Sequence, residues 1–172
     1  MPQAIAHILF PLLLISFIRD FYLKKEKKRK FSLHYALIAG LAGIILDIDV
    51  ILTSLQKYTH TLIIPLIFLF SFFIFRRADV KARICNLGRH KLKLHIIFLM
   101  LSIGTFSHIL LDALFYYPDY IFYPFLEIGF GLNFIDYLHF SSPAVIMAVL
   151  DGFLFVVWVS YLELKHKISD FI

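Results

Sequence analysis

The segment Ser107-His108-Ile109-Leu110-Leu111-Asp112 lies inside an apolar run at residues 94–117. If this run is a helix, His108 and Asp112 project from one face, one turn apart, as two ligands of one ion would. An Asp at the centre of a membrane helix costs roughly 2.5 to 3.5 kcal/mol on insertion scales, so a paired Asp and His here predict a functional site. The alternative is a hydrogen-bonded pair that joins neighbouring helices.

The composition of the whole chain is that of an integral membrane protein. Its 172 residues are 60% hydrophobic and 17% aromatic, and the mean hydropathy is +0.83, which is too apolar for a soluble domain of this length. The single cysteine, Cys85, excludes an internal disulfide framework and a cysteine-based zinc site. We predict one all-α domain over residues 1–172, a polytopic membrane helix bundle of about five transmembrane helices at residues 4–22, 31–52, 59–75, 94–117 and 143–162.

The basic residues predict the orientation of this bundle. The net charge is +5, and of the 17 Lys and Arg only Lys57 falls outside the loops that would share one side of the membrane. Cytoplasmic loops retain Lys and Arg, so we expect a multi-pass protein of the cytoplasmic membrane with an outer amino terminus and a cytoplasmic carboxyl terminus. This pattern argues against a nucleic-acid partner. The outer loop at residues 118–142 is expected to contain an interfacial or re-entrant piece carrying Tyr123 and Pro124.

Further polar residues are predicted to meet His108 and Asp112 near the outer face. At a rise of about 1.5 Å per residue, the two lie roughly 9 and 3 Å below the outer interface. The second span ends there with two acids, which would face opposite ways on a continuous helix, so either the helix end unwinds or one acid faces elsewhere. The other candidates at this level are His7 in the first span, Asp47 and Asp49 in the second, and His60 at the start of the third.

The residue types favour a divalent metal ion. Imidazoles and carboxylates without thiols suit zinc, manganese, iron or magnesium, and we favour zinc because imidazoles suit the first three. A carboxylate that does not ligate the ion, such as Asp49, is the candidate general base. Lys57 is the one outer cation able to hold a phosphate. Asp151, in the fifth span, either orients a ligating His or satisfies Ser and Tyr hydroxyls.

Several short motifs, in this order and spacing, resemble the YdjM-like family of LexA-regulated, inner-membrane-associated metal-dependent hydrolases. The resemblance implies a metal-dependent hydrolase whose ligands correspond to the His and Asp candidates above. The chain departs from the family at Val50 and Leu55, where the family has histidines. The motifs are IAHILF at residues 5–10, LDIDV at 46–50, YTHT at 58–61, SHILLD at 107–112 and YPF at 123–125.

We therefore predict a membrane-bound metal-dependent hydrolase that acts at the outer face on a small-molecule or lipid substrate, with membrane lipids as partners. The depth of the ligands suits ester or phosphoester linkages of a lipid or another amphiphile. One alternative is a non-catalytic structural membrane protein whose polar residues only hold helices together. The other is a transporter, whose polar groups would lie near the midplane on broken helices in repeated halves.

Overall fold

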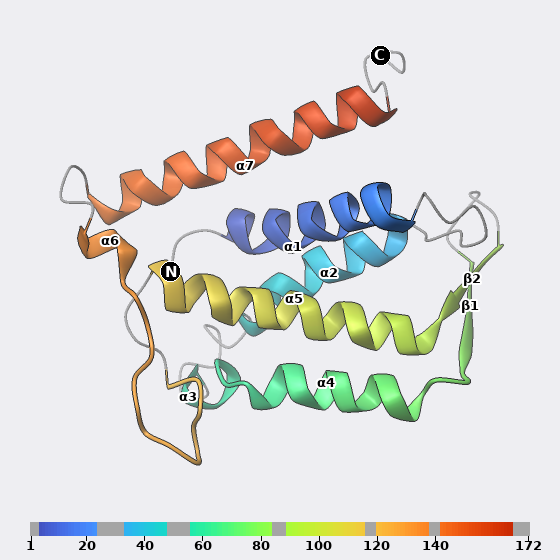
Figure 1. The fold of residues 1–172 in the computed structure, drawn as a ribbon, viewed down its shortest axis with the longest axis horizontal. Helices are drawn as coiled ribbons and strands as arrows, with labels where there is room; N and C mark the ends of the chain where they lie inside the picture. The colour runs from blue at the N-terminus through green and yellow to red at the C-terminus, as the bar shows by residue number, and fades with distance from the viewer. Residues whose placement is uncertain are drawn as a thin grey trace.

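The structure, a computed structural model, describes residues 4–23, 33–47, 56–83, 89–115, 120–137 and 142–166. These residues form a helix bundle with one small hairpin at its end, so the prediction of a mainly helical chain is confirmed (Figure 1). The elements are α1 (Ala4–Ile18) with its π-helical continuation η1 (Arg19–Leu23), α2 (Leu33–Ile45), α3 (Gln56–Thr59), α4 (Ile63–Ile74), β1 (Asp79–Arg83), β2 (Arg89–Lys93), α5 (Leu94–Phe115), α6 (Phe134–Tyr137) and α7 (Pro143–His166).

Successive long helices run in alternating directions (Figure 1). One end of the bundle collects the starts of α1, α4 and α7 and the ends of α2 and α5, and we call it the His/Asp end. The opposite end carries β1 and β2, and we call it the hairpin end. This alternation is the one that the distribution of Lys and Arg predicts.

Helix α2 packs closely against α1 and α5 because its contact faces consist of small residues. Ala36, Ala39 and Ala42 are completely buried. A Cβ atom on Gly43 would lie 2.0 Å from the carbonyl oxygen of His7 in α1, and one on Gly104 of α5 would lie 2.3 Å from the carbonyl oxygen of Ala39. Small residues let helix backbones approach in this way. The three helices therefore form a closely packed part of the bundle.

The expected number of spans needs correction. Among the described residues, two helices are long and apolar enough to cross a membrane, α5 and α7, and not about five. Helix α4 has 12 residues, which cover roughly 18 Å, against a bilayer core of about 30 Å. The third expected span breaks at residues 60–62, because Pro65 lacks an N–H donor and is tolerated only in the first turn of the following helix.

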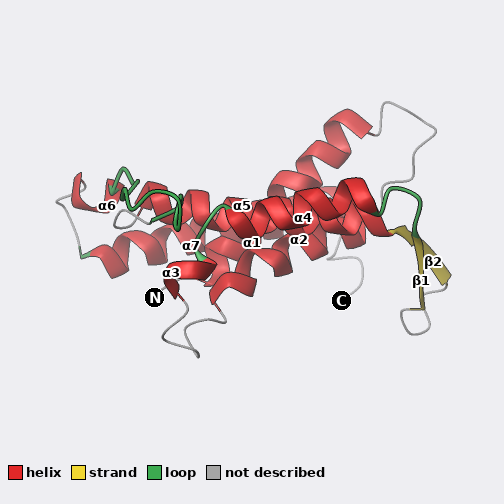
Figure 2. Ribbon diagram, turned by 90° about the horizontal axis from the view of Figure 1, so that it is seen from below, coloured by secondary structure: helices red, strands yellow, loops and turns green. Residues whose placement is uncertain are grey.

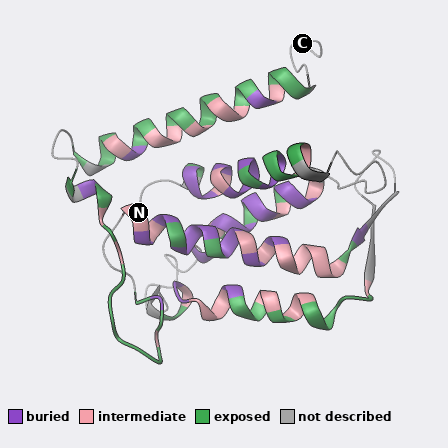
Figure 3. Ribbon diagram, in the orientation of Figure 1, coloured by how far each residue is buried: buried purple, intermediate pink, exposed green. Residues whose placement is uncertain are grey.

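The two membrane-length helices differ in burial. Helix α5 has nine buried residues, whereas α7 is exposed along most of its length, with Met147 and Tyr161 as its buried hydrophobic residues (Figure 3). The reason is position: α5 packs against both α2 and α4, while α7 contacts mainly α1. Helix α5 is therefore the centre of the bundle.

Part of the basic segment at residues 76–93, expected to be a loop, forms an antiparallel hairpin that extends from the end of the bundle (Figure 2). Asp79 pairs with Lys93, and Arg83 pairs with Arg89. The backbone N–H of Lys93 donates to the hydroxyl of Tyr35 in α2 at 2.8 Å, which fastens the hairpin to the bundle. The hairpin thus fixes the point at which α5 begins.

The segment at residues 120–137 lies over the His/Asp end and exposes most of its large apolar side chains. A turn at residues 121–125 includes Tyr123 and Pro124, and α6 follows. Two backbone bonds hold the segment: Leu62 N–H donates to the Ile121 carbonyl at 2.9 Å, and the Leu132 N–H donates to that of Ala113 at 2.7 Å. The remaining exposed apolar surface gives the segment the chemistry of an interfacial element.

Candidate metal centre

Five of the six predicted ligands meet at the His/Asp end. Helix α1 supplies His7, the 3₁₀ turn after α2 supplies Asp47, the turn before α4 supplies His60, and α5 supplies His108 and Asp112. Two groups among them could hold a metal ion, one of His7, His108 and Asp112 and one of Asp47, His60 and His108. Within each group the potential ligand atoms lie within 4.8 Å of one another.

The carboxylate of Asp112 stands among three imidazoles. Its Oδ2 lies 3.1 Å from His108 Nε2 and 3.7 Å from His60 Nε2, and its Oδ1 lies 3.3 Å from His7 Nε2. The rings of His7 and His108 are stacked, with centroids 4.0 Å apart. Helical spacing places His108 and Asp112 together, and the approach of α1 and of the turn before α4 adds the other two rings.

The remaining contacts also join atoms that can bind a metal. His108 Nε2 lies 3.6 Å from Asp47 Oδ1 and 3.2 Å from His60 Nε2. Two ligands that are each about 2.0 to 2.1 Å from a zinc ion stand about 3.3 Å apart at the tetrahedral angle. The separations that join His108 and Asp112 to their neighbours are therefore close to the distance between two ligands of one ion, within each of the two groups.

The orientation of the His108 ring shows that a proton or a metal ion is needed between this ring and Asp112. His108 Nδ1 lies 2.6 Å from the Gly43 carbonyl oxygen, near the carboxyl end of α2, where helix carbonyls have no intrahelical partner. A carbonyl only accepts, so Nδ1 carries the hydrogen and donates it. A neutral His108 then turns the lone pair of Nε2 toward the Asp112 oxygen 3.1 Å away. Two lone pairs at this distance repel, so a proton or a metal ion must lie between them.

The charge of the cluster also favours a bound cation. Asp47 and Asp112 bring two negative charges to a site where His108 is fully buried and the Asp112 side chain is 14% exposed. A single imidazolium would leave the cluster with one uncompensated negative charge. A divalent cation would balance both carboxylates, and buried charges require such compensation.

The turn that carries His60 is fixed by neighbouring groups. The hydroxyl of Thr61 donates to the carbonyl of Tyr58 at 3.0 Å, and the hydroxyl of Thr59 lies 3.2 Å from His60 Nδ1. The ring of Tyr58 meets the edge of the Tyr123 ring, with centroids 5.2 Å apart. The threonines on both sides of His60 thus hold the imidazole at the end of α5.

Asp151 of α7 lies beside the amino end of α1. Its carboxylate accepts a hydrogen bond from the backbone N–H of Ala6, one of the N–H groups that the first turn of a helix leaves free. Its Oδ1 is buried without a hydrogen-bond partner in the described part of the chain, and so is Nδ1 of the adjacent His7. Of the two roles predicted for Asp151, the position beside a ligating His agrees with the structure better than bonding to Ser or Tyr hydroxyls.

The side chains of two predicted site residues lie outside the described part of the structure. Asp49, the predicted base, lies outside the described residues, as do Val50 and Leu55. The backbone of Lys57 belongs to α3, three residues before His60, and its side chain is outside the described part. The candidate site in the described residues therefore consists of five side chains.

Sequence reasoning missed a second polar cluster, at the hairpin end. The guanidinium of Arg19 donates to Asp20 Oδ1 at 2.9 Å and to the hydroxyl of Tyr161 at 3.2 Å. That hydroxyl donates to Asp20 Oδ2 at 3.0 Å, and Lys165 Nζ lies 3.8 Å from the same oxygen. The sequence signal for this cluster was the adjacent pair of opposite charges, Arg19 and Asp20, at the end of the first apolar run.

Comparison of the chain with protein-family models, with curated proteins and with solved structures finds no match.

Proposed function

We propose that the protein is a membrane-embedded, metal-dependent hydrolase whose centre lies at the His/Asp end. The observation that carries the proposal is the ring of His108, which donates through Nδ1 to Gly43 and turns Nε2 toward Asp112. Two groups of potential ligands share His108, and each has one carboxylate and a size that could hold a metal ion. The resemblance of the sequence motifs to the YdjM-like hydrolases supports the same function.

The side chains have separate roles in this proposal. Either of two groups would hold the ion, His7 with His108 and Asp112 or Asp47 with His60 and His108, and imidazoles with carboxylates suit zinc. A bound ion would polarise an ester oxygen and make water acidic enough to act as a nucleophile near neutral pH. Asp47, the most exposed of the five at 24% of its side chain, binds the ion or takes the proton from water, the role predicted for Asp49.

Several features support a membrane location. Helices α5 and α7 are long enough to span, and large apolar side chains are exposed on α4 and α7 and at residues 120–137. We propose that α5 and α7 cross the cytoplasmic membrane and that α1, α2 and α4 pack beside α5. The positive-inside rule assigns the hairpin end to the cytoplasm and the His/Asp end to the outer face.

This depth in the membrane suits lipid-like substrates. The ester and phosphoester linkages of lipids lie near the boundary of the hydrocarbon core, at the level that we assign to the His/Asp end. We propose such a linkage in a lipid or another amphiphile as the bond that is cleaved. Lys57, close to the site in the chain, is the candidate partner of a phosphate.

The alternative function is structural. If His108 is an imidazolium, it forms an ion pair with Asp112 and no metal ion is needed between them. The contacts of His7 and His60 with Asp112 would then only hold α1, α4 and α5 together. Charge balance in that state needs a second imidazolium, at His7 or His60, whereas one divalent cation balances both carboxylates. The transporter alternative predicts polar groups near the midplane on broken helices, whereas the candidate ligands in the described residues lie at the His/Asp end.

Metal analysis of detergent-purified protein tests the proposal. We expect about one zinc, manganese or iron per chain, lost in His108→Ala and Asp112→Ala and retained in the control Asp20→Asn. The second readout is release of product from phospholipid or ester substrates with the metal present. Metal-free wild-type protein after reconstitution would establish the structural role instead. Bound metal without turnover of any ester would leave the metal site standing and refute only the hydrolase activity.

A further inference from the structure

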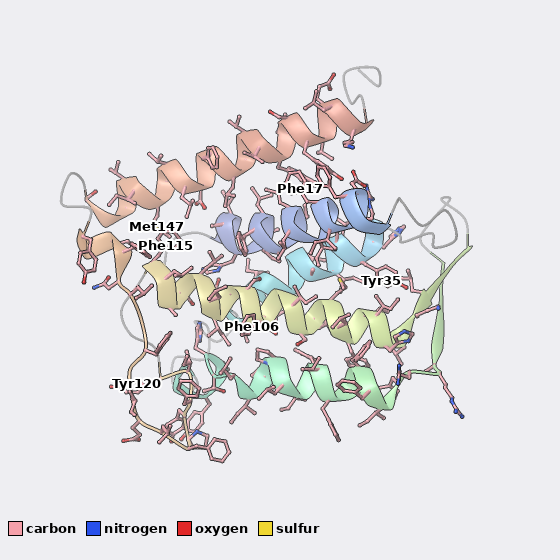
Figure 4. The ribbon with its side chains drawn as sticks, viewed as in Figure 1. Phe17, Tyr35, Phe106, Phe115, Tyr120 and Met147 are labelled. Carbon is pink, nitrogen blue, oxygen red and sulfur yellow. The ribbon has the colours of Figure 1, made fainter. Side chains whose placement is uncertain are left out.

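A half-open apolar groove runs along the junction of α4 and α5. It has a volume of about 370 Å³, at the lower end of the range of small-molecule pockets. One wall carries Leu62, Leu66 and Leu69, at helical spacing, and the other carries Leu99, Ile103 and Phe106. Figure 4 labels Phe106 between the two helices. Leu66 is 56% and Phe106 48% exposed, so the groove opens toward the surroundings of the bundle.

The lining offers no polar group to a ligand. Its single hydroxyl, that of Ser102, donates to the backbone carbonyl of Pro65 at 2.9 Å and is therefore already satisfied. Among the residues that the structure describes, no charged side chain belongs to the lining. A ligand in this groove must be apolar over the length that the groove covers.

The groove begins two residues after His60 in the chain, at Leu62. The Nε2 atom of His60 lies 3.7 Å from Asp112 Oδ2. From Leu62 to Leu69 the groove follows seven residues, or roughly 10 Å. Below it, the ring of Phe98 stacks on the rings of Phe68 and Phe75, with centroids 6.5 and 5.2 Å apart. One end is thus next to the candidate ligands, and aromatic rings fill the junction beyond the other.

We propose that this groove binds the first part of an acyl chain of a membrane lipid while the linkage of that chain lies at the metal centre. The inference rests on the proposed function and adds to it the site that binds the acyl chain of the substrate. A chain bound in this way has its polar end beside His60 and its methylenes along α4 and α5. The stretch of roughly 10 Å is about a third of the bilayer core, so the distal chain continues into the lipid.

The shape of the groove favours a chain over a protein partner. A partner helix is about 10 Å across and needs a broad apolar face. The exposed side chains of α7 provide such a face, and a Cβ added at Gly152 of α7 would meet no atom within 4 Å. The groove between α4 and α5, in contrast, is bounded by side chains on two walls and has the volume of a small ligand.

A photoreactive lipid tests the inference directly. Full-length protein is placed in phosphatidylcholine vesicles that contain a phosphatidylcholine with a diazirine on its acyl chain, irradiated, and mapped by mass spectrometry. We expect adducts concentrated on the groove residues of α4 and α5. Ile103→Trp, which fills the groove, should reduce these adducts about tenfold, whereas Val149→Trp on the exposed face of α7 should leave them unchanged.

Further variants separate the possible failures. Leu66→Trp fills the groove from the other wall, and the metal content of each variant shows that the bundle is intact. His108→Ala should keep the adducts, because the chain site does not need the metal. Adducts spread equally over α7 and the groove, or unaffected by both groove variants, would overturn the inference. Groove adducts without any lipid hydrolysis would leave the inference standing and reject the proposed reaction.

Discussion

The bundle contains two polar clusters, at opposite ends of α1. At the hairpin end, Arg19, Asp20 and Tyr161 are linked by hydrogen bonds of 2.9 to 3.2 Å, and each donor faces an acceptor. At the His/Asp end, the lone pair of a neutral His108 faces a carboxylate oxygen. Both clusters join helices that are distant in sequence.

The two clusters differ in whether each carboxylate has a cationic partner, and not in how deeply the carboxylates are buried. Asp20, with 8% of its side chain exposed, is no more accessible than Asp112 at 14%. Asp20 has two cations and a hydroxyl as partners, whereas Asp47 and Asp112 share three imidazoles that carry no fixed charge. A complete cluster holds helices together, and we expect the cluster around His108 to take up a ligand in addition. Variants at the two ends should therefore separate binding from stability.

The largest effect is expected from His108→Ala. Loss of the ring removes the atom common to both potential metal groups, so bound metal should fall from stoichiometric to trace amounts. Metal analysis and a chelator-sensitive melting temperature measure this loss. Asp20→Asn serves as the matched variant at the other end, and a loss of metal there would contradict the separation of roles.

The next effect concerns Gly43. A Cβ at this position would lie 2.0 Å from the His7 carbonyl oxygen, so Gly43→Ala must push α1 and α2 apart. Overpacking of this kind costs about 1 to 3 kcal/mol, and we expect lower thermal stability together with weaker metal binding. Gly152→Ala in α7 is the control, since its Cβ would meet no atom within 4 Å. Equal melting temperatures for the two variants would refute the close contact.

A smaller effect is expected from Asp151→Asn. The carboxylate lies beside His7, and loss of a partner of a ligating His typically lowers metal affinity about 10- to 100-fold. Competition with a chelator of known affinity measures the change. The melting temperature of the metal-free protein should stay nearly constant, because Asn keeps the size of the side chain. An unchanged affinity would restrict Asp151 to packing of α7.

The smallest effects belong to the complete cluster. Tyr161→Phe removes a hydroxyl that accepts from Arg19 and donates to Asp20, and we expect a loss of about 1 to 2 kcal/mol in unfolding free energy. Lys165→Ala should cost less than about 1 kcal/mol, since this side chain is 44% exposed and 3.8 Å from Asp20. Denaturation in detergent measures both, and metal content should not change in either.

Local and topological patterns in the sequence predicted much of the arrangement. The four-residue spacing placed His108 beside Asp112, and the alternation of basic loops predicted the helix directions that bring His7, Asp47 and His60 to the same end. These features follow from helix periodicity and from the distribution of charge, both of which can be read along the chain.

Other features depend on contacts that no local pattern reports. The hydroxyl of Tyr161 donates to Asp20, which lies 141 positions earlier in the chain. The strands at residues 79–83 and 89–93 form where charged residues favoured a loop. Pro65 shortened a predicted span because helix α4 has to begin close to it. The groove arises from two helices whose apolar side chains each look like ordinary lipid-facing positions. Such features require the pairing of elements, which periodicity does not specify.

Gly43 has a further consequence for engineering. Its missing side chain admits the His7 backbone, and its carbonyl orients the His108 ring, so one residue aligns ligands on two other helices without binding the ion. Grafting the His and Asp residues onto another scaffold would transfer the ligands and leave out the part that aligns them. The portable unit is the trio of α1, α2 and α5, with α2 acting as the spacer.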